Sequence, residues 1–437
     1  MKLSVIGCGY LGAVHAASMA VLGFEVVGID VDAAKVASLA SGVPPFYEPG
    51  FDDTLAQGLA SGRLSFSTDY AAAADADVHF LCVGTPQRPG ELAADLTYVF
   101  DAARSLAAQL ARPTLVVGKS TVPVGTATEL TALLRGLAPV GEAVDLAWNP
   151  EFLREGFAVQ DTLHPDRIVI GVQSDTAEPL LRTVYASMLA EGTPFLVMDL
   201  PTAELVKVAA NSFLATKISF INAMGEICEA TGADVTKLAD AIGFDARIGR
   251  RFLNAGIGFG GGCLPKDIRA FTARAQELGM GDAVGFLGEV DAINTRRRAR
   301  AVEMTRQFLG GTIAGKNVCV LGAAFKPDSD DVRDSPALDI AQMLSGAGAT
   351  VRIHDPKALT NAARRFPTLT MCDEIEDALR DADVVLHLTE WKQYRELDPA
   401  AAARLVRHAQ LVEGRNALDV EAWRAAGWRV KSVGRAH

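Results

Sequence analysis

A single cysteine follows a glycine-rich stretch, in surroundings that suit nucleophilic chemistry. The segment Gly258-Phe259-Gly260-Gly261-Gly262-Cys263-Leu264-Pro265-Lys266-Asp267 puts Cys263 just before a proline typical of a first helical turn. The dipole and free N–H groups of a helix N-terminus favour the thiolate, the nucleophilic form of cysteine. We expect Cys263 to be a covalent nucleophile, because a flexible, glycine-dense loop is a poor place for a packing cysteine.

Two pairs of polar residues have the four-residue spacing that places side chains on one face of a helix. Asp267 comes four residues after Cys263 and can bind water or take a proton, or else cap its own helix. Lys207 and Asn211 lie among apolar neighbours, where a lysine is costly unless it meets an anion. They are candidates for stabilising an oxyanion; the alternative is a solvated lysine at a helix edge.

Two loops follow strands at the edge where open α/β sheets bind ligands. Asn149-Pro150-Glu151-Phe152-Leu153-Arg154-Glu155-Gly156 offers Glu151 as an acid, a base or a ligand of water. Lys119-Ser120-Thr121-Val122-Pro123 follows another strand and brings the Thr121 hydroxyl to the same edge.

A glycine motif at the start of the chain predicts a dinucleotide site. Gly7, Gly9 and Gly12 follow an apolar strand and open an alanine-rich helix, so the helix N-terminus can face a pyrophosphate. The next strand ends in Asp30, whose carboxylate suits the adenosine ribose hydroxyls and would repel a 2′-phosphate. No arginine follows in residues 31–34, so the expected cofactor is NAD.

These residues need a scaffold, and the pattern of the chain predicts one. Short β-rich runs alternate with helical stretches over the first 200 residues, which predicts a parallel, doubly wound sheet. The expected strands are Leu3–Ile6, Glu25–Ile29, Val78–Val83, Leu115–Val117, Ala143–Ala147, Ile168–Ile170 and Phe195–Val197. One long helix is expected from Pro201 to Thr231, where Gly232 ends it.

The alternation resumes after Gly315, with strands expected at Val318–Leu321, Val351–His354 and Val384–Leu388 and a helix near Pro336–Leu344. Asp75-Ala76-Asp77-Val78 and Asp381-Ala382-Asp383-Val384 enter strands alike, which indicates two similar folds. The predicted class is α/β, with two Rossmann-like doubly wound domains joined by a long central helix and a small helical domain. The expected domains are residues 1–200, 201–300 and 314–437.

The turn of the second α/β domain, Gly322-Ala323-Ala324-Phe325-Lys326-Pro327, lacks the glycine motif, so a ligand other than a dinucleotide is expected there. Lys326 and Arg333 can neutralise a diphosphate or can pair with the neighbouring aspartates; the residues alone leave both readings open.

Composition excludes several classes of function. A net charge of −11 disfavours nucleic-acid and anionic-membrane surfaces. The short run Arg296-Arg297-Arg298 is expected to be a solvated helix face. The six cysteines form no CxxC pair, so no metal site is expected, and a start without an apolar leader predicts a cytoplasmic protein.

Together these segments resemble the UDP-glucose/GDP-mannose dehydrogenase family over nearly the whole chain. The matching motifs are Gly7–Gly12, Cys82–Pro86, Lys119–Pro123, Asn149–Gly156, Lys207–Asn222, Gly258–Asp267 and Ala324–Pro336. The resemblance implies a four-electron, NAD-dependent oxidation of UDP-glucose to UDP-glucuronate through a thiohemiacetal and a thioester on Cys263. It further implies that Lys207 and Asn211 stabilise the oxyanion, and that Asp267, Thr121 and Glu151 position or activate water.

The resemblance also implies the binding residues. Beside the glycine turn and Asp30, the expected cofactor contacts are Tyr10, Leu11, Lys35, Thr85, Thr121, Glu155, Lys266 and Arg333. The expected substrate contacts are Phe152, Leu153, Glu155, Lys207, Asn211, Arg247, Phe252, Gly260, Phe325, Lys326 and Arg415. Arg247 matches a residue that family dimers supply from the neighbouring subunit, so a homodimer or a higher homo-oligomer is expected.

Three alternatives stay open. The same chemistry can act on GDP-mannose or a UDP-N-acetylhexosamine. A two-electron 2-hydroxy-acid dehydrogenase would share the cofactor domain and the long helix without needing Cys263. A non-catalytic NAD-responsive binding protein would keep the fold alone.

Overall fold

The computed structural model describes residues 1–435, which divide into two compact units. Unit 1 comprises Met1–Ala210 with Ala273–Leu278, and unit 2 comprises Asn211–Thr272 with the chain from Gly279 onward. The long helix α9 (Leu200–Thr231) is present as predicted, and Gly232 follows it with a left-handed φ of +82°. At 32 residues it spans about 48 Å.

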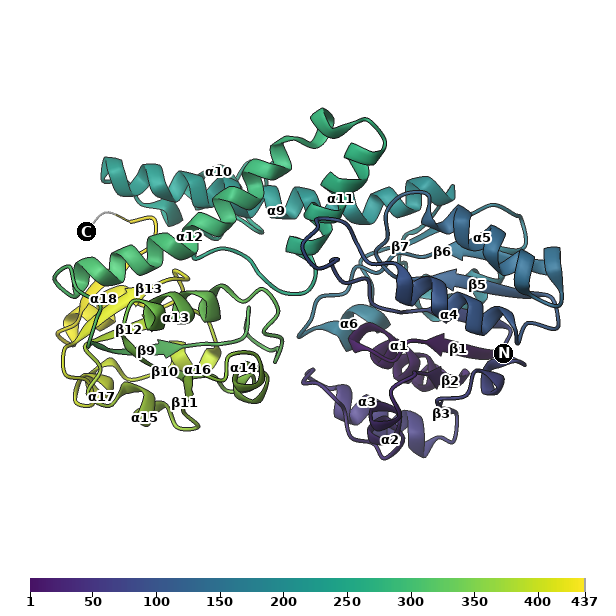
Figure 1. Cartoon of the computed structure of the whole chain (residues 1–437), viewed down its shortest axis with the longest axis horizontal. Coiled ribbons are helices and arrows are strands. Elements are labelled where there is room, and N and C mark those ends of the chain that lie inside the picture. Colours follow the sequence, from purple (N-terminus) through teal and green to yellow (C-terminus); the bar gives the residue numbers. More distant parts are fainter. Residues whose placement is uncertain (436–437) are drawn as a thin grey trace. The chain divides into compact units, whose positions relative to one another are not determined.

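Unit 1 is built on an eight-stranded sheet in the order β3-β2-β1-β4-β5-β6-β7-β8 (Figure 1). The first six strands are parallel, in the 3-2-1-4-5-6 order of dinucleotide-binding folds. The strands are β1 (Lys2–Ile6), β2 (Glu25–Ile29), β3 (Leu64–Ser67), β4 (Val78–Leu81), β5 (Thr114–Gly118), β6 (Val144–Trp148), β7 (Ile168–Val172) and β8 (Phe195–Met198). The expected strands are confirmed within two residues, and β3 was not anticipated.

The expectation of a fully parallel sheet was wrong at one junction, because β7 pairs with β6 antiparallel. The helix between them, α6 (Ala158–Leu163), has six residues and rises only about 9 Å. A five-residue strand is roughly 17 Å long, so this helix alone does not carry the chain back along the sheet. The chain therefore starts β7 at the edge where β6 ended.

Helices cover both faces of this sheet. On one face lie α1 (Tyr10–Val21), α3 (Phe51–Ala60) and α6; on the other lie α4 (Thr97–Ala107) and α5 (Thr126–Leu137) (Figure 1). Strand β5 shows why its run is uniformly apolar: Leu115 and Val117 enter one core, and Val116 enters the other. The remaining helices of this unit are α2 (Ala33–Ala40), α7 (Ala177–Val184) and α8 (Ala186–Ala190), with 3-10 turns η1 (Tyr70–Ala73) and η2 (Gly141–Ala143).

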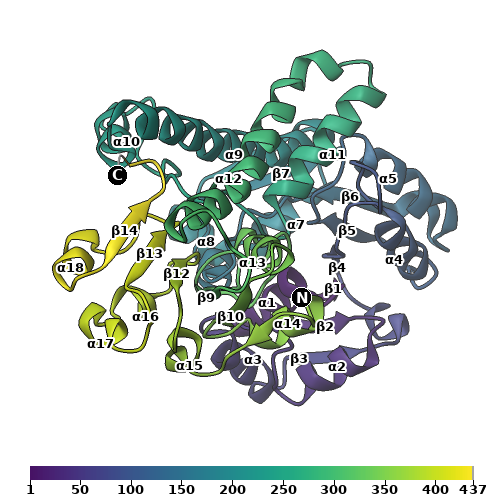
Figure 2. The same cartoon turned by 60° about the vertical axis from the view of Figure 1, so that its left-hand side comes forward.

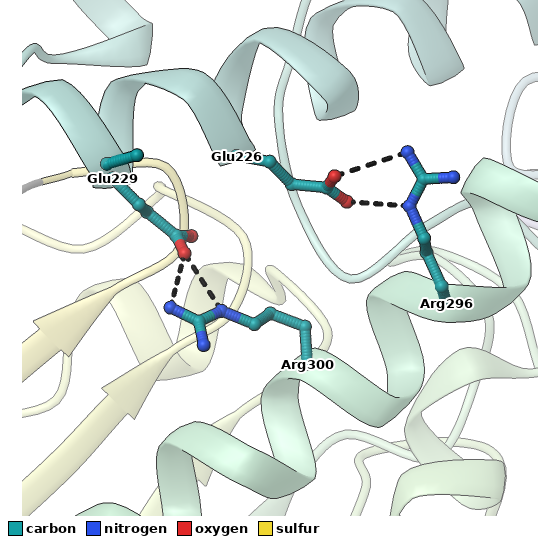
Figure 3. Close-up of a pocket in the computed structure, with 5 residues that line it drawn as sticks. Glu226, Glu229, Arg296 and Arg300 are labelled. Atoms are coloured by element: carbon teal, nitrogen blue, oxygen red, sulfur yellow. Dashed lines mark hydrogen bonds and ion pairs between the residues drawn. The ribbon is translucent and has the colours of Figure 1, made fainter.

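Unit 2 begins at Asn211, within α9. Its further helices are α10 (Val235–Gly243), α11 (Leu264–Glu277, which ends in unit 1) and α12 (Phe286–Phe308), with the 3-10 turn η3 (Gly281–Val284). Ion pairs join α9 to α12 around a shallow pocket of about 420 Å³ (Figure 3). Arg296 pairs with Glu226 at 3.1 Å, and Arg300 pairs with Glu229 at 2.7 Å. The expectation of a solvated arginine run was wrong for Arg297 and Arg298, which are 0% and 6% exposed. Arg298 pairs with Asp339 and lies 3.4 Å from Asp334, whereas Arg297 faces the glutamates of α9. The Arg297 guanidinium lies 3.5 and 3.7 Å from the two glutamates and so is paired inside the helix interface.

A second sheet completes unit 2 in the order β11-β10-β9-β12-β13-β14, which repeats the order of β3 to β6 (Figure 2). Its strands are β9 (Asn317–Leu321), β10 (Thr350–His354), β11 (Thr370–Met371), β12 (Val384–His387), β13 (Gln410–Glu413) and β14 (Arg429–Ser432). Its helices are α13 (Pro336–Gly346), α14 (Leu359–Arg365), α15 (Ile375–Leu379), α16 (Lys392–Arg395), α17 (Pro399–Ala403) and α18 (Val420–Ala425).

The predicted likeness of the two α/β parts is confirmed in atomic detail. Asp77 accepts a hydrogen bond from the backbone N–H of Lys2 at 2.9 Å, and Asp383 accepts one from that of Asn317 at 2.8 Å. Each aspartate thus fixes the start of the central strand of its sheet. Within residues 1–435, no helix has the length and apolar character needed to cross a membrane.

Candidate active site

The glycine turn of unit 1 has the close packing that its sequence predicts. Gly7 has a left-handed φ of +90°, and its N–H donates to Ile29 O at 2.7 Å. A Cβ on Gly12 would lie 1.8 Å from Gly7 O, so only glycine fits. A Cβ on Gly9 would meet no protein atom within 4 Å, so a ligand can approach this backbone closely. Since α1 begins here without a side-chain cap, its first N–H groups suit a pyrophosphate, and these residues fit NAD.

Asp30 ends β2 and is 7% exposed. One carboxylate oxygen accepts from Cys8 N at 2.8 Å and from the Lys35 ammonium at 2.9 Å, while the other accepts from Asp32 N at 3.0 Å. The equivalent residue of the second sheet is Asp355, because Gly322 N–H donates to His354 O just as Gly7 N–H does to Ile29 O.

Asp355 is saturated by its own domain. One oxygen accepts from Ala323 N, Ala324 N and the Trp391 indole, and the other accepts from Lys357 N and Ala358 N. It is 2% exposed. Five donors leave this carboxylate no capacity for a ribose, which agrees with the expectation that the second domain binds something other than a dinucleotide.

A buried glutamate that the sequence did not reveal ties the glycine-turn helix to the loop after β6. Glu48 is 2% exposed and accepts from Gly156 N and Ala158 N, each at 2.6 Å. The Tyr10 hydroxyl contacts the same carboxylate and accepts from Gly156 N at 3.0 Å. Tyr10 therefore helps to hold the loop that carries Glu151 and Glu155.

Glu151 belongs to a buried polar network at the carboxyl ends of β5 and β6. The Lys119 ammonium lies 3.0 Å from Glu151 Oε2 and donates to Asn149 Oδ1 at 2.9 Å. The other Glu151 oxygen accepts from Phe152 N at 2.7 Å and Leu153 N at 2.9 Å. Burial alone raises the pKa of Glu151, but the Lys119 charge and these hydrogen bonds outweigh it, so the pKa lies below its ordinary value. Glu151 is thus a carboxylate at neutral pH and suits the role of base or water ligand better than that of acid.

Lys207 rests against an aromatic ring within unit 1. Its ammonium lies 5.3 Å from the ring centre of Phe152, and the Arg167 guanidinium lies 3.9 Å from the same centre. The Lys207 ammonium therefore has an aromatic neighbour within the protein, which attracts a cation.

In unit 2, Cys263 lies exposed at the head of α11. Its carbonyl accepts the first hydrogen bond of the helix, from Asp267 N at 3.0 Å. Asp267 is 2% exposed, and its carboxylate accepts from the Asn211 amide at 2.6 Å and the Lys266 ammonium at 2.5 Å. The Asn211 amide and the Asp267 carboxylate thus meet on the helix that begins beside Cys263, a contact that the spacing alone did not predict.

The loop before Cys263 is tightly packed, and the expectation of flexibility was wrong. A Cβ on Gly260 would lie 2.2 Å from Asp334 O, and one on Gly262 would lie 2.2 Å from the Arg333 guanidinium carbon. Gly261 has a φ of +85° and faces the Phe325 ring, and its N–H donates to Arg333 O at 2.9 Å. A Cβ at Gly260 would clash with backbone, and one at Gly261 or Gly262 would clash with a side chain, so this packing requires glycine and restricts the loop before Cys263.

Arg415 ties this loop to the second sheet. It donates to Leu388 O at 2.7 Å, to Gly258 O at 2.9 Å and to Phe325 O at 3.2 Å. Lys326 lies over the Phe325 ring at 5.4 Å, and Arg333 pairs with Asp331 at 2.7 Å. Arg333 therefore has the aspartate partner that one of the two readings expected.

Comparison with known proteins gives the family. Residues 1–189 match the NAD binding domain of the UDP-glucose/GDP-mannose dehydrogenase family, residues 201–296 its central domain and residues 319–420 its UDP binding domain. The chain belongs to the UDP-glucose/GDP-mannose dehydrogenase family.

Relatives within the UDP-glucose/GDP-mannose dehydrogenase family match the chain from end to end. It is 41% identical to the UDP-glucose 6-dehydrogenase of Rhizobium meliloti, with 100% of each chain covered. The structure of a UDP-glucose dehydrogenase from Pyrobaculum islandicum is 40% identical with a TM-score of 0.91, covering 100% of this chain and 98% of that one. The structure of a UDP-D-ManNAc dehydrogenase from Pyrococcus horikoshii is 26% identical with a TM-score of 0.87, covering 100% and 99%.

For this family member, NAD is the cofactor, as the sequence predicted. Thr85 donates to Thr121 O at 2.8 Å, so these two expected cofactor contacts lie next to each other.

The remaining predicted binding residues differ in exposure: Glu155 is 8% exposed, while Leu11 and Leu153 are half-buried. Arg247 is exposed and paired with Asp245 at 2.6 Å, and Phe252 has a φ of +67°. Sequence patterns do not reveal Glu48, Tyr185 or Arg167, because each acts through a contact with a residue elsewhere in the chain.

Proposed function

We propose that this chain is an NAD-dependent UDP-glucose 6-dehydrogenase, which oxidises UDP-glucose to UDP-glucuronate. The observation that carries the proposal is an exposed thiol at a helix head, one turn from a buried carboxylate, in a chain 41% identical over its length to a UDP-glucose 6-dehydrogenase. A thiol in this position has no purpose in a two-electron alcohol oxidation, but it is needed to carry an acyl group.

The proposed oxidation has four steps. The C6 alcohol loses a hydride and a proton and becomes an aldehyde. The Cys263 thiolate then adds to the carbonyl carbon, forming a C–S bond and an oxyanion. A second hydride leaves this adduct to give a thioester, and water breaks the C–S bond to release the acid and the thiolate. Bound NAD supplies the hydride acceptor in both oxidation steps.

The polar residues singled out from the sequence divide these tasks. Lys207 and Asn211 donate to the oxyanion, since one is a cation and the other an amide donor one helical turn away. Asp267, Glu151 and Thr121 orient the hydrolytic water or accept its protons. In the second domain, Lys326 and Arg415 contact the uridine diphosphate sugar.

Substrate choice is part of the proposal. UDP-glucose is favoured because the relatives that match the whole chain at about 40% identity carry that substrate in their names, whereas the UDP-D-ManNAc dehydrogenase is 26% identical. Purified protein is therefore incubated with NAD and with UDP-glucose, GDP-mannose or UDP-N-acetylmannosamine in turn. Two NADH per UDP-glucose support the proposal; one NADH per substrate, or turnover only with another nucleotide sugar, contradicts it.

We also propose a homodimer, built on the exposed face of α9 in unit 2. Phe213, Phe220 and Ile227 recur every seven residues and are 67%, 49% and 58% exposed. Seven-residue spacing lines up side chains along a helix, and such an apolar stripe suits a second copy of the same helix.

A cytoplasmic location belongs to the proposed function, because reducing compartments keep a catalytic thiol reduced.

A further inference from the structure

A buried ammonium lies directly behind the Glu151 carboxylate in unit 1. Lys119 follows β5 and is 4% exposed, with its nitrogen 3.0 Å from Glu151 Oε2. Its second partner, Asn149 Oδ1, also accepts from the Tyr185 hydroxyl at 2.5 Å, and the Asn149 amide donates to Val169 O at 2.7 Å. The ammonium is therefore held by Asn149 as well as by Glu151.

Lys119 is the cation that pairs directly with the Glu151 carboxylate, at 3.0 Å. The titratable neighbours are Tyr185 from the segment after α7, Cys82 after β4 and His15 on α1. Burial raises the pKa of Tyr185 and of the Cys82 thiol, so both stay neutral. Burial and the Lys119 charge hold the pKa of His15 well below its ordinary value. Lys119 is thus the cation on which the charge of Glu151 depends.

The network also reaches Lys207. Glu151 Oε1 accepts from Phe152 N at 2.7 Å, and that bond orients the backbone that carries the Phe152 ring. Arg167 covers one side of the ring at 3.9 Å, and the Lys207 ammonium lies 5.3 Å from its centre. A change in the direction of the Glu151 carboxylate would therefore shift the ring against which Lys207 rests.

We propose that Lys119 is a positioning residue of the oxidation: it keeps Glu151 ionised, fixes the direction of its carboxylate, and through the Phe152 backbone fixes the place of Lys207. This inference rests on the proposed dehydrogenase function. It assigns Lys119 no contact with substrate or cofactor, since a side chain 4% exposed acts through its neighbours.

The test is the pH profile of kcat for Lys119→Met. Without the ammonium, burial raises the pKa of Glu151, so the acid limb of the profile should move up by at least about one pH unit. Lys119→Arg keeps the charge and should restore most of the acid limb. Lys119→Gln, which keeps a hydrogen-bond donor, should shift the limb as Lys119→Met does, and it is used in place of that variant if the latter does not fold.

Lys2→Met is the matched control, because Lys2 pairs with Asp75 at 2.5 Å at the amino edge of the same sheet. Its acid limb should stay at the wild-type position. If the wild type turns over UDP-glucose and the folded Lys119→Met or Lys119→Gln variant keeps the wild-type acid limb, the inference is overturned alone. If the wild type makes no NADH from UDP-glucose, the proposed function fails first and the inference falls with it.

Discussion

The side-chain amide of Asn211 donates a 2.6 Å hydrogen bond to the carboxylate of Asp267, which joins a residue of the long helix to the helix that begins at Cys263. The hydrogen bond fixes the direction of this carboxylate, which is 2% exposed. Such a buried acceptor one turn from the thiol suits the activation of the water that hydrolyses a thioester.

Asp267→Asn should consequently slow the hydrolysis of the thioester more than the two oxidation steps. The amide keeps the shape of the side chain but accepts protons poorly, so kcat should fall by about 10²-fold or more. Intact-mass measurement after mixing with UDP-glucose and NAD should show the chain with the uronyl group attached. A variant that is slow yet carries no added mass would contradict the assignment to hydrolysis.

Cys263→Ser should abolish formation of the acid while NAD binding remains. A serine hydroxyl at this position is a far weaker nucleophile than a thiolate, so net acid formation should drop by at least about 10³-fold. Cys372→Ser is the control, because Cys372 is half-buried in the second domain, and its activity should match the wild type. Full turnover by Cys263→Ser would refute covalent catalysis.

Glu229→Gln should weaken the junction between α9 and α12. Glu229 accepts from Arg300 at 2.7 Å and from Gly434 N at 2.7 Å, and it lies 3.7 Å from the fully buried Arg297. Loss of its charge leaves Arg297 undercompensated, at a cost of about 2 kcal/mol in the free energy of unfolding. Urea unfolding measures the change.

Glu303→Gln is the surface counterpart, since Glu303 pairs with the half-exposed Arg306 on α12. Its unfolding midpoint should not move measurably, because exposed pairs contribute little. Equal midpoints for both variants would show that the buried cluster does not hold the helices together.

Phe220→Asp should separate the proposed dimer. The ring is 49% exposed in the middle of the apolar stripe, so a carboxylate there would be buried without a partner on association. Sedimentation at micromolar concentration should then give half the wild-type mass. Leu137→Asp, at an equally exposed site on α5, should leave the mass unchanged. A monomeric wild type would exclude the dimer outright.

The local patterns of the chain predicted what local physics decides. Apolar runs bounded by glycine and aspartate marked the strands, and the spacing from Gly7 to Asp30 marked the cofactor turn. Strand β3 (Leu64–Ser67) was not predicted, because only one of its four residues is buried and the run carries little apolar signal.

What depends on distant contacts could not be predicted. Glu48 bonds to Gly156, more than a hundred residues away, and no spacing rule connects them. Arg297 looked solvated until α9 supplied two glutamates. The tight packing of Gly260 against Asp334 is likewise a property of the folded chain, so glycine content alone suggested mobility where there is constraint.

The two sheets differ most tellingly in one acidic side chain. Asp30 keeps acceptor capacity at the carboxyl end of its strand, whereas Asp355 uses all of its capacity on donors of its own domain. Two domains with the same strand order therefore need not bind the same ligand. Because the Asp355 carboxylate stabilises the turn of its own domain, that domain cannot use it to bind a ribose, and the same fold can evolve to bind a different nucleotide.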